Sequence, residues 1–197
     1  MLKFRKLDRE EINNLPLEAY SGEVKLVTSK KEVDEAFVDL SKEKVLGFDT
    51  ETQPAFNKGE HYNPSILQLA SEKCVYIIHL NKINLIEPLK NILSNHNIIK
   101  SGVAIRQDII ELNRLSNFTD KSFVDLGDIA RKNNIPHHGL RGLAALLLGF
   151  RISKQARISN WGSPELSNKQ LIYAATDAWV GLQLYSKLKE LGFINQI

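Results

Sequence analysis

Residues 45–51, Val-Leu-Gly-Phe-Asp-Thr-Glu, form an apolar run that ends in two carboxylates. The run predicts a buried strand, because it is short, rich in apolar residues and bounded by polar ones. Side chains two positions apart on a strand point the same way, so Asp49 and Glu51 are expected to face one site. Like charges this close repel, so one carboxyl keeps a proton or a cation lies between them. Magnesium and manganese prefer oxygen ligands and suit such a pair.

The acidic pair alone is weak evidence, because the same spacing recurs at Asp8-Arg9-Glu10, which fits a solvated helix start. Asp49 and Glu51 differ in that they end an apolar strand, where an uncompensated charge is costly. The functional and the structural interpretations of this pair therefore stay open until other residues are considered.

Two further signals lie later in the chain. In Tyr173-Ala174-Ala175-Thr176-Asp177 the hydroxyl and the carboxylate are four residues apart, so on a helix they share one face. Asp108 lies one turn into a predicted helix that follows an apolar strand ending near Ala104. Each signal alone also fits an ordinary helix surface.

The periodicity of the chain predicts an α/β fold with a mixed sheet flanked by helices. Residues 1–43 are expected to form an N-terminal extension of helix, strand and helix, packed on a domain of residues 44–197. Its first helix begins at the capping pair Asp8 and Glu11 and is predicted to run toward Tyr20. Within the domain, strand candidates begin near residues 45, 65, 74, 98 and 123, and a long final helix begins at the capping pair Ser167 and Gln170.

Bulk properties exclude several classes of protein. The 197 residues suffice for a full core, and the net charge of +3 neither requires nor excludes a nucleic-acid partner. Cys74 is the only cysteine, so one chain has neither a disulfide nor a cysteine-based zinc site, and its apolar surroundings predict a small buried hydrophobe. No run has the length of a membrane span, and the start does not resemble a signal peptide. We therefore expect an intracellular, cytoplasmic protein without a membrane partner; its oligomeric state cannot be predicted.

Taken together, the motifs resemble those of the DEDDy superfamily of 3′-5′ exonucleases, which includes ribonuclease D, the Werner-syndrome exonuclease domain and polymerase proofreading domains. The similarity extends over roughly residues 44 to 190, and the flanking Ser159-Asn160-Trp161 segment is most similar to the Werner and ribonuclease D branch. The matching motifs are Phe48-Asp49-Thr50-Glu51, Lys100-Ser101-Gly102-Val103-Ala104 leading to Asp108, and Tyr173 with Asp177.

The resemblance implies an RNase H-like fold with a five-stranded mixed sheet. It implies that Asp49, Glu51, Asp108 and Asp177 hold two divalent cations, Mg²⁺ or Mn²⁺, with Asp49 bridging both. Two such cations about 3.5–4 Å apart can activate a water and stabilise the leaving oxygen during phosphodiester hydrolysis. Tyr173 would orient the water rather than act as a base, because a free tyrosine has a pKa of about 10.

A stretch without acidic residues indicates where a nucleic acid would lie. From residue 129 to residue 164 there is no Asp or Glu, which favours contacts to phosphates. Arg157, Lys154 and Arg141 are the candidate substrate-binding residues, and a solvated basic face is the alternative. Trp161 fits a loop anchored to the core better than a platform for a base. The same stretch also contains Arg131, Lys132 and Arg151.

The expected activity is removal of 5′-mononucleotides from single-stranded or recessed 3′ ends. DNA is favoured over RNA, because ribonuclease D carries additional helical domains that this sequence lacks. Three alternatives remain: ribonuclease D-like processing of RNA 3′ ends, a catalytically silent nucleic-acid-binding or scaffolding domain, and a phosphohydrolase for small nucleotides. The presence of all four carboxylates argues against the silent domain, and the basic stretch favours a polymer over a mononucleotide.

Overall fold

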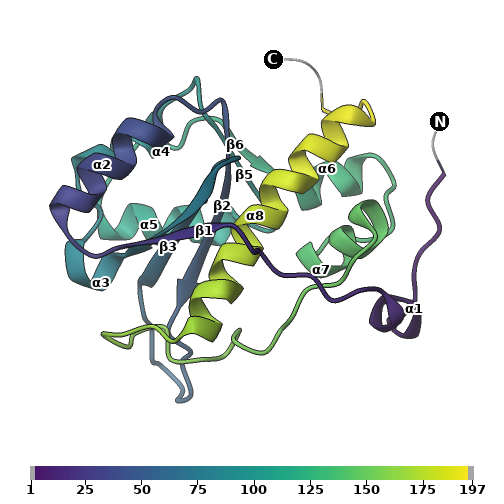
Figure 1. Ribbon diagram of the computed structural model, residues 1–197, viewed down its shortest axis with the longest axis horizontal. Coiled ribbons are helices and arrows are strands. Elements are labelled where there is room, and N and C mark those ends of the chain that lie inside the picture. The colour runs from purple at the N-terminus through teal and green to yellow at the C-terminus, as the bar shows by residue number, and fades with distance from the viewer. Residues whose placement is uncertain (1–2, 195–197) are drawn as a thin grey trace.

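A mixed sheet of six strands forms the centre of the computed structural model, which describes residues 3–194 (Figure 1). The strand order across the sheet is β1-β4-β3-β2-β5-β6. The central strand β2 is antiparallel to β3 and parallel to β5. The strands are β1 (Glu23–Val27), β2 (Val45–Thr52), β3 (Pro64–Ala70), β4 (Cys74–His79), β5 (Ile99–Gly102) and β6 (Phe123–Asp125).

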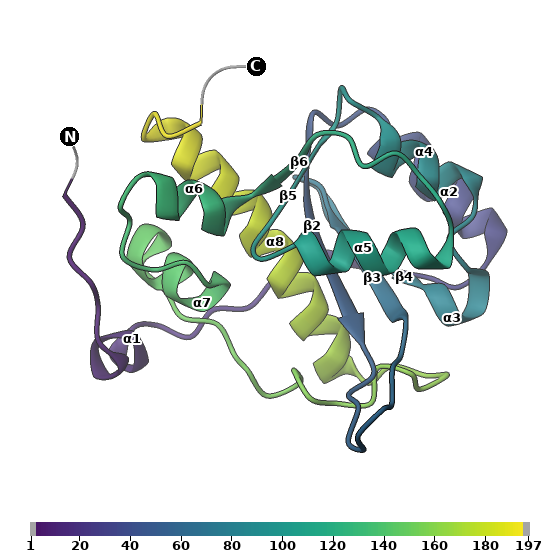
Figure 2. The same ribbon diagram turned by 180° about the vertical axis from the view of Figure 1, so that it is seen from behind.

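Helices cover both faces of this sheet, as the view from behind also shows (Figure 2). One face packs against α2 (Lys30–Leu40), α3 (Leu80–Ile83), α4 (Glu87–Ser94) and α5 (Arg106–Leu115). The other face packs against α8 (Asn168–Glu190), and beyond α8 lie α6 (Leu126–Lys132), α7 (Leu140–Leu143) and a π-helical turn, Ala144–Leu148. The short α1 (Arg9–Asn14) lies beside α7, at the periphery of the molecule.

The predicted fold class is confirmed, with one strand more than the five expected. The additional strand is β1, which was predicted as a strand of the N-terminal extension and here pairs in parallel with β4 at the edge of the sheet. α1 was predicted to continue toward Tyr20, which is wrong: it ends at Asn14. The reason is Pro16, whose ring disfavours helical geometry at Leu15, and Leu15 is extended with ψ 154°.

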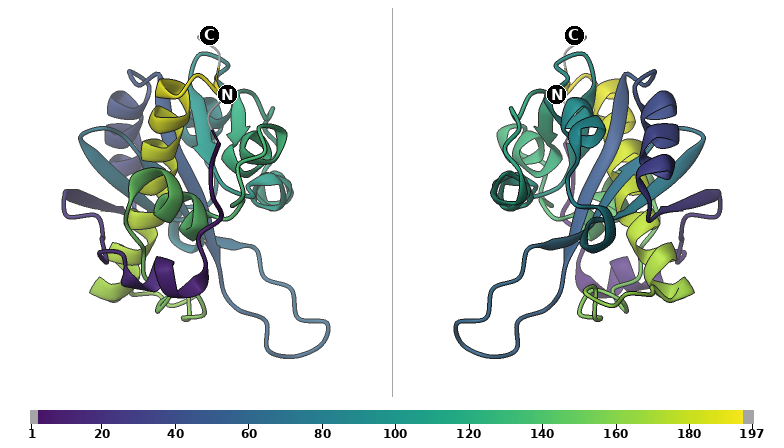
Figure 3. Two further views of the ribbon diagram at one scale, coloured as in Figure 1. Left: turned by 90° about the vertical axis from the view of Figure 1, so that its right-hand side faces the viewer. Right: turned by 90° about the vertical axis from the view of Figure 1, so that its left-hand side faces the viewer.

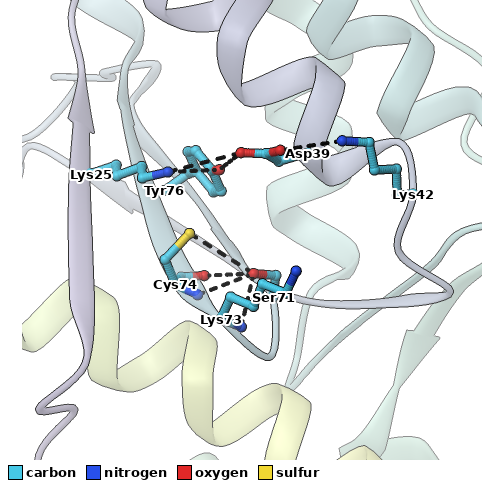
Figure 4. Close-up of polar contacts among 7 residues, drawn as sticks. All are labelled: Lys25, Asp39, Lys42, Ser71, Lys73, Cys74 and Tyr76. Atoms are coloured by element: carbon cyan, nitrogen blue, oxygen red, sulfur yellow. Dashed lines mark hydrogen bonds and ion pairs between the residues drawn. The ribbon is translucent and has the colours of Figure 1, made fainter.

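Contacts between α2, β1 and β4 attach the N-terminal region to the sheet (Figure 4). The Tyr76 hydroxyl donates to an Asp39 carboxylate oxygen at 2.9 Å. The Lys25 ammonium lies 3.9 Å from the same carboxylate and 5.3 Å from the centre of the Tyr76 ring. These contacts link β1 and α2 to β4.

The turn between β3 and β4 is closed by Ser71 (Figure 4). The Ser71 hydroxyl accepts from the Cys74 backbone N–H at 3.2 Å and donates to the Cys74 carbonyl at 3.0 Å. Cys74 is 4% exposed, and this confirms its prediction as a small buried hydrophobe.

Close packing of α8 on β2 sets the geometry of the functional site. Gly47 lies on the face of β2 that α8 covers, and a Cβ there would lie 1.9 Å from the Ala178 carbonyl oxygen. A second small residue, Gly181, lets α8 approach β5, where a Cβ would lie 2.9 Å from the Ser101 carbonyl oxygen. Glycine is therefore required at residue 47 by the contact between backbone and helix rather than by its φ angle.

The connection between β2 and β3, residues 53–63, projects from the end of the sheet where β2 finishes (Figure 3). It carries His61 and Tyr62, to which the sequence assigned no role.

Within residues 3–194 the structure contains no helix with the length and hydropathy that a bilayer crossing requires.

Candidate active site

Three carboxylates meet where the end of β2 passes under α8. Asp49 and Glu51 project from alternate positions of β2 toward the helix, as the period of a strand predicts. Asp177 projects from the middle of α8 and is buried. Each of the three residues offers a ligand oxygen, and these oxygens all lie within 4.8 Å of one another. Such a set of hard oxygen donors fits Mg²⁺ or Mn²⁺.

Tyr173 lies one helical turn before Asp177. The side chains of both residues line one cavity, as the four-residue spacing predicts. Its ring packs against Trp161, with 6.0 Å between the ring centres. Trp161 has no exposed surface and belongs to the core under α8. The prediction that Trp161 anchors its loop is confirmed, because a fully buried indole cannot stack on a base.

Asp108 lies in the first turn of α5, across β2 from Asp177. Its carboxylate accepts a short hydrogen bond from the Thr50 hydroxyl. It is not part of the group of three close ligand oxygens, but its charge raises the pKa of Asp49. The structure therefore places all four predicted carboxylates around the end of β2, three of them in close contact.

Asp125, a residue not predicted to matter, fixes the position of the helix that carries Asp108. Its two carboxylate oxygens accept from the backbone N–H groups of Ala104 and Ile105, at 3.2 and 3.1 Å. Ala104 has φ +62°, a strained value for a residue with a side chain, and these bonds hold the turn into α5. Asp125 is the last residue of the short strand β6 and caps α6, and in the sequence only its place at the end of a strand candidate could have indicated its role.

The electrostatics of the cluster favour a bound cation. Burial raises the pKa of Asp49 well above its usual value, and the charges of Asp177 and Asp108 raise it further. Burial also raises the pKa of Glu51 to about 10, with Asp49 adding to the shift and Arg157 opposing it. Burial raises the pKa of Asp177 to about 7, and a hydrogen bond from Tyr173 opposes this shift. Protons must therefore stay on the cluster at neutral pH, unless a cation replaces them.

A cavity of about 700 Å³ opens beside Tyr173 and Asp177. It is lined by the three candidate substrate-binding residues, Arg141, Lys154 and Arg157. Two other basic residues of the acid-free stretch are engaged elsewhere: Arg131 pairs with Asp128, and Arg151 donates to the Leu15 carbonyl at 3.1 Å. Part of the basic stretch thus faces the cavity, whereas Arg131 and Arg151 bind other groups away from it.

Gln68 is a further polar residue that the sequence analysis missed. It pairs with Asp49 across β2 and β3, so both side chains lie on the face covered by α8. It is fully buried, and neither its amide nitrogen nor its amide oxygen has a hydrogen-bond partner among the described residues. The only signal was a single amide within the apolar run Ser65-Ile66-Leu67-Gln68-Leu69-Ala70.

Comparison with known proteins places this arrangement in one family. A family model described as a 3′-5′ exonuclease matches residues 24–192. The bifunctional 3′-5′ exonuclease/ATP-dependent helicase WRN of Mus musculus is 34% identical over 94% of this chain, which spans only 14% of that relative. The chain thus corresponds to a part of that longer protein.

Solved structures of exonuclease domains and ribonucleases share the fold of this chain. The crystal structure of the Nibbler EXO domain of Aedes aegypti has a TM-score of 0.75 at 26% identity, with 97% of this chain and 93% of that chain covered. Ribonuclease D of Trypanosoma brucei in complex with RNA U12 has a TM-score of 0.74 at 17% identity, with 91% of this chain and 64% of that chain covered, and shares the fold. With its family model matched along most of its length and its carboxylates gathered under α8, the chain belongs to the family of 3′-5′ exonuclease domains.

Proposed function

We propose that this chain hydrolyses the terminal phosphodiester bond of nucleic-acid 3′ ends and releases 5′-mononucleotides. One observation carries the proposal: the clustered ligand oxygens of Asp49, Glu51 and Asp177 lie beside a cavity lined by basic residues. The carboxylates suit divalent cations, and the basic residues suit the phosphates of a polymer.

Two divalent cations, Mg²⁺ or Mn²⁺, are proposed to be held by Asp49, Glu51, Asp108 and Asp177. Bound cations would acidify the attacking water and stabilise the leaving 3′ oxygen. Asp49 would be the central ligand of this set, because the charges of both Asp177 and Asp108 act on it.

Tyr173 is proposed to orient the attacking water. Burial raises the pKa of Tyr173 above its usual value, and the charges of Asp177 and Glu51 raise it further. Its hydroxyl therefore stays protonated at neutral pH and can donate or accept a hydrogen bond, but it cannot act as a base.

Arg141, Lys154 and Arg157 are proposed to bind the nucleic acid. Several basic side chains in one cavity favour a polymer over a mononucleotide as the substrate. DNA is the favoured substrate, in single strands or at recessed 3′ ends. RNA is the second candidate, because the structural relative from Trypanosoma brucei is described in complex with RNA U12.

The test is to incubate the protein with 5′-labelled single-stranded DNA, recessed duplex DNA and RNA, each with magnesium, manganese or EDTA. The expected result is a metal-dependent ladder that shortens from the 3′ end, with DNA degraded faster than RNA. Asp49→Asn, which keeps the shape of the side chain, should abolish the ladder. A folded protein that binds manganese and cleaves none of these substrates would contradict the proposal.

A further inference from the structure

Residues of the N-terminal segment 7–13 line the same cavity as Tyr173 and Asp177. The cavity reaches from Leu7, Arg9 and Asn13 to Tyr173 and Asp177. Its volume of about 700 Å³ is within the range of about 300–1,000 Å³ that is typical of ligand sites. The segment therefore shares a space with the reacting centre, although it precedes the part of the chain that matches the family model.

Hydrogen bonds attach this segment to the rest of the fold before and after α1. The Leu7 backbone N–H donates to His137 Nε2 at 3.2 Å. Beyond α1, the Arg151 backbone N–H donates to the Pro16 carbonyl at 2.8 Å, and Arg151 O accepts from the Glu18 N–H at 2.9 Å. The segment is thus attached to the rest of the fold on both sides of α1, and it holds its place in the cavity wall.

Asn13 joins α1 to the basic wall of the cavity. Its side-chain oxygen accepts from Arg141 Nη2 at 2.6 Å. Arg141 Nε is buried and has no hydrogen-bond partner among the described residues. An unmatched donor of a charged group is costly, and an anionic ligand in the cavity would remove that cost.

The charge of the cavity wall is strongly positive. Asp177 is the only acidic residue in the lining. None of the four basic side chains has a salt-bridge partner within the part of the chain that the structure describes, whereas Arg5 outside the cavity pairs with Glu11. The basic lining residues are Arg9, Arg141, Lys154 and Arg157.

We propose that Arg9 and Arg141 bind backbone phosphates of the nucleic-acid strand, and that Asn13 positions the Arg141 guanidinium. The N-terminal segment is then part of the nucleic-acid site rather than a structural extension. This inference rests on the proposed function for its substrate class. It adds two residues to that site, Arg9 and Asn13, and gives α1 a role.

The test measures binding without hydrolysis. Fluorescence anisotropy with a labelled single-stranded oligodeoxynucleotide is recorded in EDTA over a range of salt concentrations. Arg9→Ala is expected to weaken binding about three- to fivefold at about 100 mM salt and to lower the slope of log K against log salt by about 0.7, the value for one phosphate contact on a single strand. Lys31→Ala is the matched control, because it removes one exposed charge on α2, and it should bind like the wild type.

A double-mutant cycle tests the role of Asn13. Asn13→Ala changes no charge, yet it should weaken binding about twofold, because Arg141 loses its orientation. In an Arg141→Ala background the same substitution should have no further effect on binding. A purely structural role of Asn13 would instead lower stability in both backgrounds.

The inference is overturned if Arg9→Ala binds with the affinity and salt slope of Lys31→Ala. Arg9→Glu checks that result, because a charge reversal in contact with phosphate must weaken binding more than Arg9→Ala does. Failure of the proposed function gives a different result: the wild type binds the oligonucleotide in a manner that depends on Arg9, but does not shorten it with any metal.

Discussion

Replacing Asp177 with asparagine is expected to stabilise the metal-free protein at alkaline pH. Burial raises the pKa of Asp177 from 3.8 to about 7. The folded state therefore retains a proton that the unfolded chain releases, and stability falls as the pH rises from about 4 to about 7. At about 1.4 kcal/mol per pKa unit, a shift of about three units gives an upper limit of roughly 4 kcal/mol. Asparagine keeps the size of the side chain and removes this cost.

The assay is thermal unfolding in EDTA at pH 8 and again near pH 4. A gain of about 2 to 4 kcal/mol should raise the Tm by roughly 5 to 15 °C at pH 8. Near pH 4 the two proteins should differ little, because the Asp177 carboxyl is then largely protonated in the folded state. Adding Mn²⁺ at pH 8 should stabilise the wild type more than the variant, because the variant lacks one carboxylate ligand.

A variant that is less stable than the wild type in EDTA at pH 8, or equally stable, would refute this reasoning. Such a result would mean that the Asp177 charge is already compensated without a cation. The cost of burying the Asp177 charge would then no longer support a metal site.

Three further predictions concern Tyr173, Gly47 and His137. Tyr173→Phe should lower kcat about 10- to 100-fold with an unchanged Tm, and unchanged turnover would exclude Tyr173 from the mechanism. Gly47→Ala should lower the free energy of unfolding by about 3 kcal/mol in urea, since the added methyl group meets the Ala178 carbonyl; full stability would contradict that contact. His137 Nε2 accepts from Leu7 only when the imidazole is neutral. Burial lowers the pKa of His137 from its usual 6.5, so this bond should weaken only at a more acidic pH than that, where the ring takes up a proton. Hydrogen-exchange protection at Leu7 should then be smaller at pH 5 than at pH 8, whereas a pH-independent value would contradict this bond.

Local patterns predicted the elements that carry the chemistry. The run that ends in Asp49 and Glu51 is a strand, and the Ser167–Gln170 capping box begins α8. The alternation along β2 and the four-residue spacing on α8 placed four side chains, those of Asp49, Glu51, Tyr173 and Asp177, on facing surfaces. These features could be predicted because each depends on the period of a single element.

Features that depend on contacts between distant segments could not be predicted. The bond between Thr50 and Asp108 joins residues 58 positions apart, and the bond between Asn13 and Arg141 joins residues 128 positions apart. The partner of Gln68 in the sheet is Asp49, which only the register of β2 and β3 reveals. No local period encodes such pairings, so Asp108, Arg141 and Asp49 were predicted as site residues but their partners Thr50, Asn13 and Gln68 were missed.

The same limit applies to the N-terminal region. The sequence predicted its strand, but the pairing of β1 with β4 brings together segments about fifty residues apart in a parallel arrangement. The sequence also predicted the helix that follows this strand, but not which face of the sheet α2 covers.

Anomalous diffraction from crystals soaked in manganese would locate the cation itself. An anomalous peak is expected at the carboxylate oxygens of Asp49, Glu51 and Asp177, with a second peak near Asp49 and Asp108. Both should weaken or vanish in Asp49→Asn. Crystals of a protein that degrades 3′ ends with manganese, but that show no peak at these carboxylates, would contradict the account.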